Sequence, residues 1–202
     1  MTPSAVVAID VAILVPEEVA GPARAINRAL AGEGPGVLRL DDSHLPHITL
    51  AQQFVERARL DDLCRALDWL LRHEAALPLR VAGAAADHGT VQLVVDPAPD
   101  LQRIHELVMD GLEMFEAREG GPEAFERGGE TIRSRDVDWV RTFREHAAYA
   151  RYRPHVTLGH GDVCPAAAPI DFIATRIAVS RLGRFCTCRA SLHEWTLARR
   201  PV

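Results

Sequence analysis

The sequence contains no lysine, and all 23 of its basic residues are arginine. Arginine suits two-point contacts with phosphate better than lysine does, but the base composition of a GC-rich genome explains the excess more simply than function does. The basic residues are outnumbered by 28 acidic ones, and the net charge of −5 argues against a broadly basic surface that coats nucleic acid. The remaining composition, 48% hydrophobic and 25% charged, is typical of a globular protein.

Long apolar runs are absent as well. No stretch reaches the roughly 18 apolar residues of a membrane span, so we expect no association with a membrane. The apolar N-terminus lacks a basic segment and is interrupted by Asp10, which is typical of a strand and not of a signal peptide. Without a secretion signal, we expect a cytoplasmic protein whose four cysteines are reduced.

Patterns that would hold a metal ion are weak. Cys186 and Cys188 precede His193 at a spacing that a metal clip can use, but they alternate with apolar residues as a strand does, and a fourth ligand is missing. A metal-dependent hydrolase could instead use His44 and His47 with carboxylates, although the turn between these two histidines should separate them. We therefore predict no metal and no cofactor.

One short stretch occurs twice, as PHITL at residues 46–50 and as PHVTL at residues 154–158. The two copies differ only where one β-branched residue replaces another. In both copies His and Thr alternate with apolar residues, which is the period of a half-buried strand. We predict two strands that each present an imidazole and a hydroxyl on one face, from His47 with Thr49 and from His155 with Thr157.

The rest of the chain predicts strands, hairpins and helices in alternation. Outside the second motif, strands are expected at 5–15, 36–40, 45–55, 79–86, 90–96, 170–181 and 184–198, and helices at 16–30, 57–74, 101–115 and from residue 136. Frequent hairpins, and the lack of a glycine-rich phosphate loop after a strand, exclude a doubly wound parallel sheet. We predict a single α+β domain over residues 1–202, made of two lobes related by a rough twofold axis, each half of the chain building a strand-rich unit.

Three expectations concern packing. The segment 116–135 has two glycine pairs and dense charge, which indicates a mobile insertion, and together with the following helix it would form an insertion or lid at 116–150. Phe54 is in phase with the apolar residues of the first motif, so we expect it in the same core. The three tryptophans are expected as core anchors, with Trp139 also a candidate for stacking on a base.

Two histidines that face each other across a cleft suit acid–base catalysis of phosphoryl transfer. A neutral imidazole takes a proton from water or from a sugar hydroxyl, and a protonated imidazole gives one to the departing oxygen. Histidine titrates near neutral pH, so both forms are accessible. The threonine hydroxyls would donate hydrogen bonds to the non-bridging phosphate oxygens, where the transition state must be stabilised. This scheme requires no metal.

The stretches HITL at 47–50 and HVTL at 155–158 resemble the doubled His-x-Thr-x signature of the 2H phosphoesterase superfamily. That group includes 2′,5′ RNA ligase-like proteins and cyclic nucleotide phosphodiesterases. The resemblance covers the motifs, their separation and the order of elements, and so nearly the whole chain. It implies a bilobal α+β fold, in which two antiparallel sheets related by a pseudo-twofold axis, with outer helices, surround a central cleft lined by both motifs.

The resemblance also implies an activity, which is the metal-independent hydrolysis of 2′,3′-cyclic phosphates or of related 2′-linked phosphodiesters in RNA and nucleotides. By position in the motifs, His47 and His155 would be the acid–base pair, with either one as the acid, and Thr49 and Thr157 would hold the phosphate. Many relatives carry a basic residue where this chain has His160.

Residues beside the second motif are further candidates for substrate binding. Tyr152 and Arg153 could contact a base or a phosphate, although a solvated connection between helix and strand explains them equally well. His160 is expected at the rim of the cleft. The partner would be a nucleotide or the end of an RNA, bound by a monomer. The alternatives are a module that binds the same ligand without turnover, and 2′,5′ RNA ligase activity.

Overall fold

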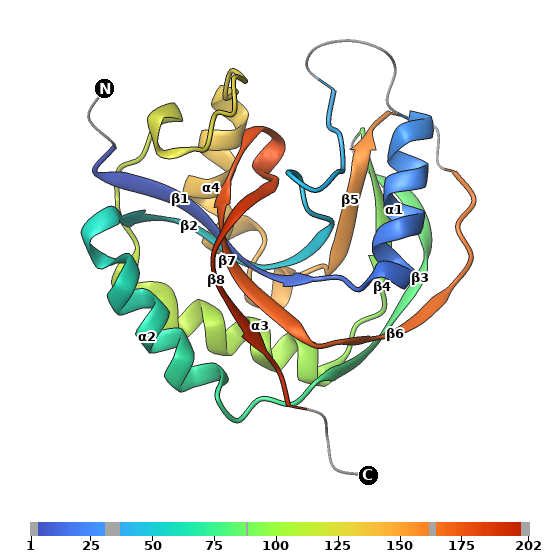
Figure 1. Cartoon of the computed structure of the whole chain (residues 1–202), viewed down its shortest axis with the longest axis horizontal. Helices are drawn as coiled ribbons and strands as arrows, with labels where there is room; N and C mark the ends of the chain where they lie inside the picture. The colour runs from blue at the N-terminus through green and yellow to red at the C-terminus, as the bar shows by residue number, and fades with distance from the viewer. Residues whose placement is uncertain (1–3, 31–36, 88, 162–164, 199–202) are drawn as a thin grey trace.

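The computed structural model describes residues 4–30, 37–87, 89–161 and 165–198 (Figure 1). Two four-stranded sheets form its framework, and neighbouring strands in both are antiparallel. The first sheet has the order β2 (His47–Glu56), β1 (Val6–Leu14), β7 (Arg176–Leu182) and β8 (Cys188–Thr196). The second has the order β5 (His155–His160), β4 (Thr90–Val95), β3 (Leu77–Asp87) and β6 (Ile170–Ala174). The predicted α+β class with two antiparallel sheets is confirmed.

Helices pack against the faces of both sheets. They are α1 (Glu17–Leu30), α2 (Leu60–Leu71), α3 (Pro99–Leu112) and α4 (Ser134–His146), with short 3₁₀ turns at Arg57–Arg59, Glu113–Phe115, Pro122–Ala124, Tyr149–Arg151 and Arg184–Cys186. Figure 1 shows α1 beside the second sheet and α2 and α3 beneath the first. One continuous hydrophobic core joins the helices to both sheets. In the described parts of the chain, no helix combines the length and the apolar character that crossing a membrane requires.

The two halves of the chain exchange elements, so the expectation that each half builds its own unit is wrong. The first sheet combines β1 and β2 with the C-terminal β7 and β8, and the second sheet combines β5 with the hairpin of β3 and β4. Helices also cross between the halves, because α1 packs on β5 and α3 packs on β2. Each motif strand is therefore supported by a helix from the opposite half of the chain.

The predicted strand at 170–181 is two strands that belong to different sheets. In β6 only every second residue, Phe172 and Ala174, is buried, whereas β7 is buried on both faces from Ile177 to Ser180. β6 pairs with β3, and β7 pairs with β1. The chain switches sheets at this point, which a continuous apolar alternation cannot accommodate.

The predicted strand at 36–40 is not formed by residues 37–40, and residue 36 lies outside the described residues. The side chain of Asn27 replaces a neighbouring strand here. Its Nδ2 donates to Leu38 O at 2.9 Å, and its Oδ1 accepts a hydrogen bond from Leu40 N at 2.8 Å. Because the backbone groups are satisfied by this side chain, Leu38 and Leu40 stay buried without a β-ladder.

The segment 116–135 packs on the first sheet. Phe125 and Ile132 are buried in a second apolar cluster with Ala8 and Phe54, and the rings of Phe125 and Phe54 meet edge to face. The segment is therefore a packed cover in this structure, and its motion as a lid stays a prediction. Phe54 is buried as predicted, but it faces this cluster and not the core of the motif.

Two smaller expectations are also corrected. Trp69 and Trp139 are 63% and 43% exposed, so they do not anchor the core. The helix expected from residue 136 begins earlier, at Ser134. Asp136 is the third residue of this helix, and it completes a capping box by accepting a hydrogen bond from the backbone N–H of Arg133.

Candidate active site

A β-bulge sets the face that the first motif presents. In the pairing of β2 with β1, the register shifts by one residue after Thr49, and Leu50 becomes the extra residue. On the two sides of the bulge, His47, Thr49 and Gln52 stand opposite alternate residues of β1 and so share one face. Asp10, opposite Gln52, lies on that face as well. The bulge explains why the polar residues stay together although their sequence spacing breaks the period of two.

The second motif has the same bulge at the equivalent residue. The register of β5 with β4 shifts after Thr157, and Leu158 is left over. In each case a buried side chain binds the carbonyl of the bulged leucine. His105 Nδ1 donates to Leu50 O at 2.7 Å, and Asn27 Nδ2 donates to Leu158 O at 2.7 Å. These two groups come from α3 and α1, the helices that cross between the halves.

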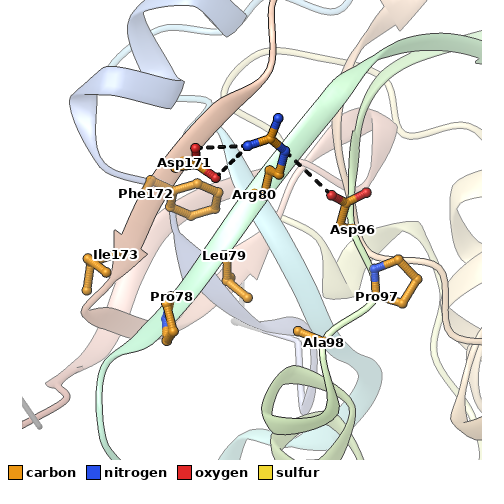
Figure 2. Close-up of a pocket in the computed structure, with 9 residues that line it drawn as sticks. All are labelled: Pro78, Leu79, Arg80, Asp96, Pro97, Ala98, Asp171, Phe172 and Ile173. Carbon is orange, nitrogen blue, oxygen red and sulfur yellow. Dashed lines mark hydrogen bonds and ion pairs between the residues drawn. The ribbon is translucent and has the colours of Figure 1, made fainter.

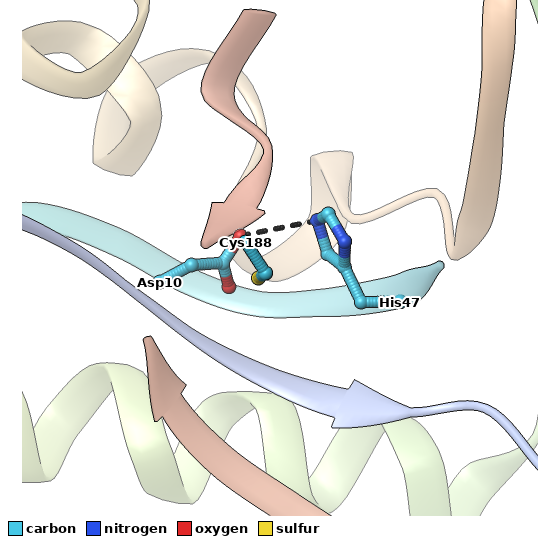
Figure 3. Close-up of side chains that lie close together, drawn as sticks. All are labelled: Asp10, His47 and Cys188. Atoms are coloured by element: carbon cyan, nitrogen blue, oxygen red, sulfur yellow. Dashed lines mark ion pairs between the residues drawn. The ribbon is translucent and has the colours of Figure 1, made fainter. Parts of the chain in front are cut away.

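His47 is held at both ends of its ring. Nδ1 donates to Leu45 O at 2.7 Å, and Nε2 lies 3.5 Å from Asp10 Oδ2 (Figure 3). Asp10 is fully buried, and its Oδ2 accepts hydrogen bonds from Thr49 Oγ1 at 2.8 Å and from Gln52 Nε2 at 2.6 Å. The Thr49 hydroxyl therefore supports Asp10 in this structure. Sequence reasoning did not assign a role to Asp10, although a carboxylate inside a buried strand is itself a signal, because burying a charge is costly.

His155 is oriented in the same way. Its Nδ1 donates to Arg153 O at 2.8 Å, so both motif histidines bind the carbonyl two residues earlier, across a proline. With Nδ1 donating to a carbonyl, Nε2 is the nitrogen left to exchange a proton. Thr157 is half-buried on the same strand, two residues further along.

The surroundings shift the pKa values of the two histidines in opposite directions. Burial favours neutral His47, but contact with Cys188 and with the Asp10 carboxylate outweighs burial and raises the pKa of His47 well above its ordinary value. Burial lowers the pKa of His155, and the nearby charge of His47 lowers it further, against the contact with Arg153 O. The strands that carry the two motifs, β2 and β5, are in contact with each other.

The family model of the 2′-5′ RNA ligase superfamily matches residues 15–200, nearly the whole chain. The chain belongs to the 2′-5′ RNA ligase superfamily, the 2H phosphoesterases. Among solved structures, E. coli LigT in its apo form is 15% identical with a TM-score of 0.60, over 97% of this chain and 100% of LigT. TT0787 of Thermus thermophilus is 17% identical with a TM-score of 0.55, over 96% of this chain and 100% of TT0787. No curated protein matches.

Tyr152, which precedes the second motif, contacts the backbone of the first motif. Its hydroxyl donates to Thr49 O at 2.9 Å, and its ring stacks on His105 with 3.9 Å between the centroids. Tyr152 is buried, so it supports the first motif and is not displayed to a ligand. Arg153 is exposed, and its Nη1 donates to the carbonyls of Ala150 and Tyr152, at 3.2 and 2.9 Å.

His160 lies at the end of β5, where its ring is 5.1 Å from that of Phe185. Phe185 lines a hollow of about 390 Å³ together with Leu38, Arg39, His44, Glu130 and Arg184, among others. The turn that carries Phe185 has φ values of 63° and 53° at Phe185 and Cys186, a left-handed conformation that residues with side chains seldom adopt. The guanidinium of Arg133 lies over the Phe185 ring at 3.9 Å.

Neither of the metal arrangements considered from sequence is formed. Cys186 Sγ contacts Asp136 O at 3.7 Å, and His193 pairs with Asp68 at 3.7 Å on an exposed face. His44 binds Asp41 at 2.9 Å and also contacts Arg189. Among the described residues, the ligand atoms of a different trio lie within 4.8 Å of one another, those of Asp10, His47 and Cys188 (Figure 3).

A further hollow lies away from both motifs, between β3 and β6 (Figure 2). Its charged side chains satisfy one another, because Arg80 donates to both carboxylate oxygens of Asp171 at 2.9 Å and lies 3.8 Å from Asp96. No residue of either motif lines it.

Proposed function

We propose that this protein is a phosphodiesterase that opens 2′,3′-cyclic phosphates, or related 2′-linked phosphodiesters of RNA ends and nucleotides, without a metal. The observation that carries the proposal is the pair of histidines from two sheets, each fixed through Nδ1. The pKa of His47 is raised and the pKa of His155 is lowered. Two groups whose environments separate their pKa values supply an acid and a base at the same pH.

In the proposed reaction His155 is the base and His47 the acid. Neutral His155 Nε2 takes a proton from a water molecule as the water oxygen attacks phosphorus. Protonated His47, stabilised by the Asp10 carboxylate, gives its proton to the ester oxygen as the bond from that oxygen to phosphorus breaks. The step consumes one water, and proton exchange with solvent restores both imidazoles.

Thr157 and Thr49 would stabilise the negative charge that develops on the non-bridging oxygens. Thr157 would do so directly, and its position on the same face of β5 as His155 supports this role. The hydroxyl of Thr49 donates to Asp10 in this structure. It would have to rotate toward the phosphate, or act by holding Asp10 against His47.

The substrate class is supported by a relative and by the rim of the site. Structures of E. coli LigT have been determined with 3′-AMP and with ATP, and these share the fold of this chain with TM-scores of 0.58 and 0.59. In this chain, His160 lies beside the Phe185 ring, which the guanidinium of Arg133 covers, and we propose this aromatic and cationic group as a contact for a nucleotide. Arg153, exposed before the second motif, is the nearby cation that we propose for a further phosphate of an RNA end.

We propose that the protein is a monomer and that it acts in the cytoplasm. Cys64, Cys186 and Cys188 are free thiols in the structure, which agrees with a reducing compartment. Sedimentation of the purified chain would test the monomer.

Hydrolysis of nucleoside 2′,3′-cyclic phosphates in the presence of EDTA tests the proposal, with products identified by phosphorus NMR. We expect His47→Ala and His155→Ala to abolish turnover, since general acid and base catalysis each contribute about 10²–10⁴-fold. His73→Ala is the matched control, because His73 is an exposed histidine in the turn after α2. Turnover that survives in both motif variants, or that disappears with EDTA, would refute metal-free catalysis by this pair.

A second candidate is the joining of RNA ends through a 2′,5′ linkage, which the name of the superfamily itself suggests. The same acid and base can act with a 5′-hydroxyl in place of water: the base takes the proton of that hydroxyl as it attacks phosphorus, and the acid protonates the 3′ oxygen as its bond to phosphorus breaks. Incubation with a 2′,3′-cyclic end and a 5′-hydroxyl end distinguishes the two: a 2′,5′-linked product that accumulates faster than the hydrolysed end would favour the ligase.

A further inference from the structure

Asp10, His47 and Cys188 bring three different ligand atoms to one place from three strands of the first sheet. The carboxylate oxygen, the imidazole nitrogen and the thiol sulfur lie within 4.8 Å of one another. Asp10 and Cys188 are fully buried, and the side chain of His47 is 12% exposed. Solvent therefore reaches the cluster only through the partly exposed side chain of His47.

Each member of the cluster is held by contacts of the kind that orient metal ligands. Leu45 O accepts the Nδ1 hydrogen of His47, which leaves Nε2 facing Asp10. The backbone N–H of the same Leu45 donates to Cys188 O at 3.0 Å, so one residue fixes both the histidine and the cysteine. Thr49 and Gln52 bind only Oδ2 of Asp10.

An unsatisfied polar atom points to a missing ligand. Within the described residues, Oδ1 of Asp10 is buried and has no hydrogen-bond partner. A buried carboxylate oxygen without a partner is rare and calls for an explanation such as an ion. Oδ2 of the same carboxylate lies 3.5 Å from His47 Nε2, so the group that carries the unpaired oxygen is a member of the cluster.

We propose that Asp10, His47 and Cys188 form a zinc-binding site, and that zinc bound there blocks hydrolysis by occupying Nε2 of His47. One sulfur, one nitrogen and one oxygen ligand match Zn²⁺, whereas Mg²⁺ and Ca²⁺ prefer oxygen ligands alone. On binding, the Cys188 thiol and the imidazolium each release a proton to solvent. The inhibition rests on the function proposed above, whereas the binding does not.

Three protein ligands leave the fourth position of a tetrahedral zinc ion open. That position would be filled by water or by a phosphate oxygen of a nucleotide in the site. With its Nε2 lone pair bound to zinc, His47 can no longer carry the proton that the leaving oxygen needs. Zinc would therefore reduce turnover even when the nucleotide remains bound.

Cobalt binding to the full-length, chelator-treated protein tests the site itself. We expect one Co²⁺ per chain, a thiolate-to-cobalt charge-transfer band in the near ultraviolet, and loss of that band when Zn²⁺ displaces the cobalt. Cys188→Ser should lose the band, and Cys186→Ser should keep it, because Cys186 is only two residues away but binds Asp136. No band in the unaltered protein, or an unchanged band in Cys188→Ser, would overturn the site.

A measurement on the unaltered protein covers the case that Cys188→Ser fails to fold. X-ray absorption at the zinc edge should show one sulfur at about 2.3 Å and nitrogen or oxygen ligands at about 2.0–2.2 Å. A first shell without sulfur would refute the participation of Cys188.

Activity measurements test the inhibition separately. Zinc equal to the protein concentration should abolish hydrolysis, EDTA should restore it, and Cys188→Ser, compared with its own zinc-free rate, should need at least tenfold more zinc. Full activity of the unaltered protein when zinc is shown to be bound would refute the inhibition. Absence of hydrolysis in the zinc-free protein would refute the proposed function and leave the cobalt and X-ray results as they stand.

Discussion

Replacement of Asp10 by Asn tests whether this carboxylate keeps the proton on His47. Asn has nearly the same shape and can still accept hydrogen bonds from Thr49 and Gln52, so the fold should survive. What the variant loses is the negative charge 3.5 Å from His47 Nε2. Two full charges at that separation interact by about 5 kcal/mol at an effective dielectric constant of about 20. The two hydrogen bonds to Oδ2 stabilise part of the Asp10 charge already, so this figure is an upper limit.

The expected effect depends on pH. Because the contact with Asp10 helps to raise the pKa of His47, the acid form persists to higher pH in the unaltered protein. Removing the charge lowers that pKa, so the alkaline limb of the rate profile moves to lower pH. Under alkaline conditions we expect a loss of up to about 10²-fold in kcat, the lower range of what a general acid contributes. Under acidic conditions, where His47 is protonated in both proteins, the loss should be much smaller.

The assay is the pH dependence of kcat for a nucleoside 2′,3′-cyclic phosphate, measured with EDTA. Asp62→Asn is the control, because Asp62 is exposed on α2 and contacts only Arg65 among the pairs described. An alkaline limb that stays in place in Asp10→Asn would show that Asp10 does not hold the proton on His47. A uniform loss at every pH would mean that Asp10 acts by position alone.

Three further changes address the supports of the motifs. Asn27→Ala removes three buried hydrogen bonds and should lower the free energy of unfolding by about 2–4 kcal/mol in urea titrations; a loss within error would show that the 37–40 segment and Leu158 need no such support. His105 donates to Leu50 O and its Nε2 accepts from Tyr149 N, so the folded protein holds this histidine neutral, and burial lowers its pKa. Below about pH 6.5 the unfolded chain therefore binds more protons than the folded protein. The free energy of unfolding should fall on acidification in the unaltered protein, and it should fall less in His105→Ala. Tyr152→Phe loses only the bond to Thr49 O and should reduce kcat, whereas a rise in KM alone would place Tyr152 in substrate binding.

Much of the fold could be predicted from periodicity. The helices at 57–74 and 101–115 carry apolar residues at helical spacing, and they appear as α2 and α3 within a few residues. The switch of sheets at Thr175 could not be predicted in this way, because local alternation does not say which strand is the neighbour. Partners are chosen by contacts far apart in the sequence, such as Leu77 opposite Ala174.

Some residues of the candidate site could likewise be predicted from the sequence, and others could not. The motif residues His47 and His155 were found because they repeat, and the structure presents them in matching geometry. Sequence reasoning did not assign three residues to the site, namely Asp10, Cys188 and Asn27. None of them belongs to a repeated motif, and the role of each depends on a partner strand or helix. A charged residue within an apolar segment was a signal available in the sequence for Asp10.

The two motifs share one scaffold, and Asp10 is one of the residues that make their chemistry unequal. The registers of β2 with β1 and of β5 with β4 can be superimposed position by position, including the bulge. In that correspondence Asp10, opposite Gln52, is replaced in the second sheet by Thr90, opposite His160. A hydroxyl cannot supply the charge that a carboxylate gives to an imidazolium. The repeat therefore builds two equivalent histidines, and in the proposed reaction the carboxylate of Asp10, which has Thr90 in its place in the second sheet, helps to make His47 the acid and leaves His155 as the base.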